Sequence, residues 1–76
     1  MSQGSVAYYG SVEWANAELS FAIRTLQGKV ESSSWKHRLQ TVLVIKELLE
    51  EYGYHWQVWV LECWIHRLQP RVEAGQ

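Results

Sequence analysis

Apolar residues recur along the first third of the chain at the spacing that places them on one face of a helix. The residues of this stripe are Val12, Ala15, Leu19, Ala22 and Leu26. Their alternating spacings of three and four residues are typical of a packed helix. Ser11 precedes the stripe and can cap its first turn. The pattern predicts a helix from about residue 11 to about residue 31, with Gly28 weakening only its last turn.

Two short breaks divide the rest of the chain. Three serines at 32–34 favour a turn, and Ser34 can cap the segment that follows. Gly53 suits the left-handed conformation that ends many helices, and Pro70 cannot continue one. We therefore predict helices at 35–52 and 54–69. Because a single glycine separates them, one long kinked helix is the alternative.

These patterns predict an all-α protein, an antiparallel helical hairpin followed by a third, aromatic-rich helix. A short break between two heptad-patterned helices favours antiparallel packing. The expected single domain spans 11–69. A frayed tail follows at 70–76, and residues 1–10 form a flexible arm or a segment that docks through Tyr8 and Tyr9. The residues expected in the core are Leu19, Leu26, Leu39, Val42, Leu49, Val58, Leu61 and Ile65, with Leu43 and Leu48 broadening the stripe of the second helix.

The third helix is apolar around most of its circumference. One stripe consists of Tyr54, Val58, Leu61, Ile65 and Leu68, and the tryptophans Trp56, Trp59 and Trp64 lie outside it with Val60 and Cys63. The polar residues His55, Glu62, His66 and Gln69 form one narrow line. Such a helix is normally buried on several sides, but two other helices can cover only one. We expect a partner or dimer interface at Trp56, Trp59, Trp64, Trp35 and Tyr52.

The size of the chain also points to association. A domain of 76 residues buries only about 60% of the surface that its unfolded chain exposes, so small domains rely on disulfides, metals or oligomerisation. The single cysteine, Cys63, allows no internal disulfide and favours a reducing compartment. One cysteine and three scattered histidines are a poor supply of zinc ligands. We therefore expect a homodimer.

The charges of the second helix run against its dipole. The basic residues Lys36, His37 and Arg38 lie in its first turn, and the acidic residues Glu47, Glu50 and Glu51 lie in its last turns. Each misplaced charge costs about 0.3–1 kcal/mol when nothing compensates it. Two copies of this helix packed antiparallel about a two-fold axis would supply the compensation, so these six residues are a candidate charged interface. The alternative is that water solvates them and the cost is tolerated.

The same basic turn supports an alternative function, a dimeric DNA-binding transcriptional regulator. Two helices joined by a short turn resemble a helix-turn-helix, whose second helix presents its first residues to the major groove. DNA affinity requires several phosphate contacts, however, and one turn supplies few cations. The net charge of −1 adds no general attraction. Nucleic acid is therefore not our expected partner.

Several residues that could bind a metal ion or act in catalysis lie in the third helix, but their spacing does not favour either role. Glu62 and His66 lie one turn apart and could share a metal ion, whereas Cys63 is rotated by about 100° from Glu62. A catalytic Cys63 would need a base and a concave pocket, and a cysteine on an apolar face is usually buried. We expect no enzyme activity, metal or cofactor.

The sequence predicts neither a signal peptide nor a membrane segment. Its N-terminus lacks a cationic run, and its densest apolar run is far shorter than the roughly 20 residues that span a bilayer. We expect a cytoplasmic protein. Its predicted function is that of a small, non-catalytic regulator or inhibitor that binds a larger protein. Compact, aromatic-rich chains of this kind are common among phage and plasmid accessory proteins, which is a comparison of composition only.

Overall fold

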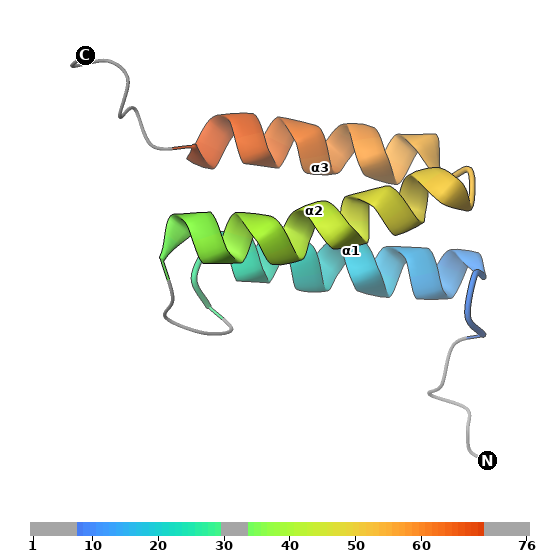
Figure 1. Ribbon diagram of the computed structural model, residues 1–76. Coiled ribbons are helices and arrows are strands. Elements are labelled where there is room, and N and C mark those ends of the chain that lie inside the picture. The colour runs from blue at the N-terminus through green and yellow to red at the C-terminus, as the bar shows by residue number, and fades with distance from the viewer. Residues whose placement is uncertain (1–7, 30–33, 70–76) are drawn as a thin grey trace.

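The computed structural model describes residues 8–29 and 34–69, which form three helices (Figure 1). Helix α1 spans Val12–Leu26, α2 spans Trp35–Glu51 and α3 spans His55–Leu68. Figure 1 shows α2 running in the opposite direction to α1 and α3. No strand occurs in the described ranges, so the predicted all-α class is confirmed. The predicted tail at 70–76 and the first seven residues of the predicted arm lie outside these ranges.

Helix α1 is bounded by a serine cap and a glycine. The side-chain oxygen of Ser11 accepts a hydrogen bond from the backbone N–H of Trp14 at 3.1 Å. At the other end Gly28 adopts a φ of +76°. Its N–H and that of Lys29 donate to the carbonyls of Thr25 and Arg24, each at 3.0 Å. This is the Schellman arrangement, and it ends α1 at Leu26, before the predicted end at about residue 31.

The break at Gly53 has the same geometry. Gly53 has a φ of +82°. Its N–H donates to the carbonyl of Glu50 at 3.0 Å, and the N–H of Tyr54 donates to Leu49 at 2.9 Å. The backbone therefore reverses here, and α2 and α3 are separate helices rather than one kinked helix. At its start, α2 is capped by Ser34, whose hydroxyl oxygen accepts from the N–H of His37 at 3.3 Å.

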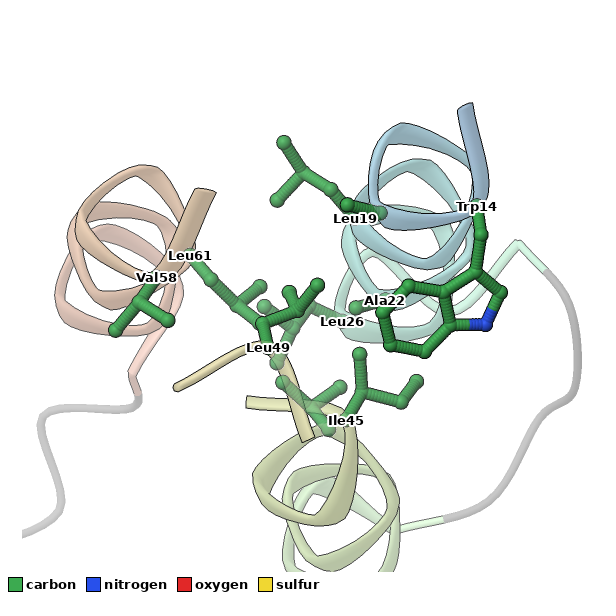
Figure 2. Packing of buried hydrophobic residues seen from close by; sticks show 10 residues of the cluster. Trp14, Leu19, Ala22, Leu26, Ile45, Leu49, Val58 and Leu61 are labelled. Carbon is green, nitrogen blue, oxygen red and sulfur yellow. The ribbon is translucent and has the colours of Figure 1, made fainter. Parts of the chain in front are cut away.

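The core lies along the line where the three helices meet. Figure 2 shows Leu26, Leu49 and Leu61 pointing toward one another, one from each helix, and all three are almost fully buried. Among the eight residues predicted for the core, Leu39 and Ile65 are only partly buried, and the other six are buried. Ala15 and Ala22 of the predicted first stripe are buried as well, and so are Trp14 and Ile45. Val12, part of the predicted stripe, is instead 48% exposed.

An aromatic cluster closes one end of the bundle. It consists of Tyr9, Trp14, Tyr52 and Tyr54. The ring centre of Trp14 lies 4.9 Å from that of Tyr9, 5.1 Å from that of Tyr52 and 6.4 Å from that of Tyr54. The hydroxyl of Tyr54 also donates to the carbonyl of Gly10. Of the two tyrosines predicted to dock the N-terminal segment, Tyr9 therefore joins the cluster, whereas Tyr8 is 85% exposed.

One polar side-chain pair, with Gln57 buried and Asn16 exposed, links α1 to α3. The side-chain amide of Gln57 is buried and donates to the side-chain oxygen of Asn16 at 3.1 Å. A buried amide without such a partner would cost about 1–3 kcal/mol. The pair therefore favours one alignment of the two helices.

Gly10 and Gly53, which both have positive φ angles, allow a stability prediction. At Gly53 no heavy atom lies within 4 Å of an added Cβ, so Gly53→Ala should cost only the left-handed strain, about 1–2 kcal/mol. At Gly10, where φ is +89°, the added Cβ would lie 2.8 Å from Cε2 of Tyr52. We expect Gly10→Ala to lower the free energy of unfolding in urea by more than Gly53→Ala does. Equal losses would show that the ring of Tyr52 moves aside freely.

The aromatic cluster predicts a loss of stability at alkaline pH. Partial removal from water raises the pKa of Tyr52, with further contributions from Tyr9 and Glu51. The folded state thus favours the neutral hydroxyl, and the resulting stability is present below the unfolded pKa of about 10 and is lost as pH rises through the folded value. Between about pH 9 and pH 12, Tm should fall less steeply for Tyr52→Phe than for the wild type. Tyr8→Phe is the matched control, and a Tyr52→Phe protein that follows the wild-type curve would contradict the prediction.

Candidate functional site

One side of α3 presents tryptophan to solvent. Trp56 is 61% exposed and Trp59 is 59% exposed. Val60 and Trp64 beside them are half-buried, and Cys63 is exposed. We call these five residues the tryptophan face. The sequence placed at least one of the three tryptophans outside the core, and the structure places two of them there.

The tryptophan face follows from the way α3 meets its neighbours. Val58 and Leu61 point into the core, and Ile65 is partly buried against it. Residues at three- and four-residue spacings lie together on a helix, so Trp56, Trp59 and Cys63 share another side. α1 and α2 both lie on the core side (Figure 2). Neither helix covers Trp56, Trp59 or Cys63, whereas Val60 and Trp64, at the border of the tryptophan face, are partly buried against the core.

A shallow hollow of about 120 Å³ lies on the tryptophan face. It is lined by Trp59, Val60, Cys63, Trp64 and Arg67. The guanidinium carbon of Arg67 lies 5.9 Å from the centre of the Trp64 ring, a distance at which a cation is attracted to the aromatic face. The hollow therefore has aromatic walls and a single positive charge at its edge.

The line of polar residues on α3 is exposed, as the sequence predicted. His55, Glu62, His66 and Gln69 are all in contact with solvent. Glu62 forms an ion pair with Lys46 of α2, with 3.3 Å between Oε2 and Nζ. Within 8–29 and 34–69, no three His, Cys, Asp or Glu side chains lie close enough together to hold a metal ion.

Two of the aromatic residues predicted for the interface lie elsewhere. Trp35 is half-buried against the core, with the guanidinium carbon of Arg38 6.0 Å from its ring centre. Tyr52 is 45% exposed but belongs to the aromatic cluster. Both residues are therefore engaged within the bundle, and neither belongs to the tryptophan face.

A second exposed surface runs along α2. We call it the outer face of α2, and its residues are Lys36, His37, Gln40, Leu43, Val44, Glu47, Glu50 and Glu51, all exposed. It contains five of the six residues of the predicted charged interface; Arg38 is half-buried and is not on it. The first turn of α2 has no acidic residue and the last turn no basic one. The reversal of charge along the helix is therefore present.

Two features of these surfaces were not expected from the sequence. Leu43, predicted to broaden the core stripe, is 42% exposed, and Val44 beside it is 60% exposed. Val42 and Ile45 take the core positions of this turn, so Leu43 and Val44 are turned outward. Cys63, expected to be buried, is exposed because the core side of α3 is already occupied by Val58 and Leu61.

The chain matches no protein-family model, and no significant match was found to any curated protein or solved structure. Among the described helices, none has the length and apolar character needed to cross a membrane.

The exposure of Cys63 can be tested with a maleimide reagent. Because the thiol reaches solvent, we expect native and urea-denatured protein to be labelled at similar rates, with Cys63→Ser as the unlabelled control. A thiol that reacts only after unfolding would contradict the described surface of α3.

Proposed function

We propose that this protein is a small, non-catalytic protein-binding module that holds a larger protein through the tryptophan face of α3. In this proposal two copies of the bundle, each a hairpin of α1 and α2 with α3 packed on it, act together as a homodimer. The observation that carries the proposal is the exposure of Trp56 and Trp59, each about three-fifths accessible on one side of one helix.

The energetics of tryptophan support a binding role. A tryptophan side chain buries roughly 150–250 Å² when it enters an interface, and tryptophan is enriched among the residues that dominate binding energy. Trp56, Trp59 and Cys63 follow one another at the spacing of a helix that lays one side into a groove. The partner that fits such a side is a protein with an apolar groove.

The edges of the tryptophan face resemble the rim of an interface. Arg67 is the charged residue that lines the hollow, and the exposed His55 and His66 lie along the polar line of the same helix. Interfaces commonly combine an apolar centre with a polar, hydrated rim. A partner groove with an acidic border beside Arg67 would complement this arrangement.

A binding role also fits the chemistry of the hollow better than catalysis does. Its lining offers a thiol and a guanidinium but no carboxylate or imidazole that could act as a base. A module of this size acts by occupying a surface of its partner, which is the action of a small regulator or inhibitor such as a phage or plasmid accessory protein.

The proposal predicts that partner binding depends on Trp56 and Trp59. We expect the double variant Trp56→Ala/Trp59→Ala to weaken binding by about 2 kcal/mol or more, roughly a thirtyfold rise in Kd. The partner is first isolated from host lysate with wild-type protein, and its Kd is then measured by calorimetry for each variant.

Phe21→Ala is the matched control, since Phe21 is a 43% exposed aromatic residue on α1. An unchanged Kd for the double variant would refute the role of the tryptophan face. A salt-sensitive shift of DNA that is lost in Lys36→Glu would instead favour the DNA-binding alternative.

A further inference from the structure

We infer that the outer face of α2 joins two copies of the chain, packed antiparallel about a two-fold axis that passes between Leu43 and Val44. The inference deepens the proposed function, on whose homodimer it rests, by assigning the surface and the register through which the copies meet.

The outer face of α2 has the spacing of a helix–helix seam. Lys36, Leu43 and Glu50 follow one another at intervals of seven residues, and so do His37, Val44 and Glu51. Two neighbouring rows with this interval form one continuous stripe along a helix. Figure 2 shows Ile45 and Leu49 of α2 directed toward α1 and α3. The stripe is therefore on the side that points away from both helices.

The order of residues along the stripe is complementary to itself when reversed. An axis midway between Leu43 and Val44 brings Lys36 opposite Glu51 of the second copy, and His37 opposite its Glu50. In the same register Gln40 meets Glu47, and Leu43 meets Val44. A two-fold contact repeats each of these pairs on both sides of the axis. Basic, apolar and acidic positions thus each find a suitable partner.

Other alignments lose this complementarity. A parallel pair would place Lys36 beside Lys36 and Glu51 beside Glu51, and like charges at close range are destabilising. An antiparallel pair centred one turn later, at Glu47, would bring the two Glu47 side chains together and leave Lys36 without an opposite charge. Charge therefore selects both the direction and the register of the seam.

The second copy would supply the charges that the dipole of α2 requires. Within the chain, the first turn of α2 has no acidic residue and its last turn has no basic one. In the dimer the carboxylate of Glu51 approaches the positive end of the other α2, and Lys36 approaches the negative end. An open hollow lined by Val44, Glu47, Leu48, Glu50 and Glu51 lies on the acidic half. It offers three carboxylates to an incoming cationic side chain.

Sedimentation of the full chain at a series of concentrations tests the inference. We expect a dimer whose Kd rises by about tenfold or more in Lys36→Glu and in Glu51→Lys, since each change replaces two attractive pairs with two repulsive ones. Both changes improve the dipole of an isolated α2. The Tm of the dissociated chain should therefore not fall, which separates loss of the dimer from loss of the fold.

Mixing the variants gives the sharpest result. In a mixture of Lys36→Glu with Glu51→Lys, every pair between positions 36 and 51 is again of opposite charge, so a heterodimer should form. The double variant Lys36→Glu/Glu51→Lys should recover the homodimer by itself. Lys29→Glu is the control, because Lys29 is exposed but lies outside α2, and it should leave Kd unchanged.

Two results would overturn the inference. One is a wild-type chain that stays monomeric at millimolar concentration. The other is a dimer that ignores both charge reversals but dissociates in Trp56→Ala/Trp59→Ala, which would place the tryptophan face between the copies. Binding of the larger partner is measured separately with those tryptophan variants, so the protein-binding proposal stands or falls independently of the seam.

Discussion

The packing of Leu26, Leu49 and Leu61 along one central line is the contact on which the rest of the structure depends. It uses one side of each helix, and the described ranges contain no fourth helix or strand that could cover the other sides. Small domains leave much of their apolar surface exposed for this geometric reason. The exposure of Trp56 and Trp59 on α3, and of Leu43 and Val44 on α2, follows directly.

Two glycines in left-handed conformations make this packing possible. Gly28 and Gly53 end α1 and α2 abruptly, so the chain reverses twice and its short helices lie side by side. The turn at Gly53 also brings Tyr52 and Tyr54 against Trp14, which is distant in sequence. Had α2 and α3 been one continuous helix, α3 could not fold back on the core, and the direction of its tryptophan face would be undefined.

Periodicity in the sequence predicted the helices, most of the core and the exposed polar line of α3, because each of these depends on spacing within one helix. It failed where a contact with another helix decides the outcome. Leu43 fits the apolar stripe of α2, but Val42 and Ile45 occupy the space between the helices. Gln57 is buried beside Asn16 of α1, to which it donates a hydrogen bond, and Trp14 is buried against Tyr9, which precedes α1, and Tyr54, which precedes α3. The spacing of residues within one helix does not indicate such contacts between different elements.

The two exposed surfaces lie on different helices, and this separation has a consequence for the proposed dimer. In the proposed dimer, a seam along α2 would leave the tryptophan face of α3 uncovered in both copies, so the assembly would present two equivalent binding surfaces. A partner that is itself a dimer, or that repeats its groove, would be held at both surfaces, and the second contact would form within the complex at a high effective concentration. A monomer with the same tryptophan face would lack this gain. In the proposed dimer, the charge order of α2, which is unfavourable in the isolated chain, would select the antiparallel pair.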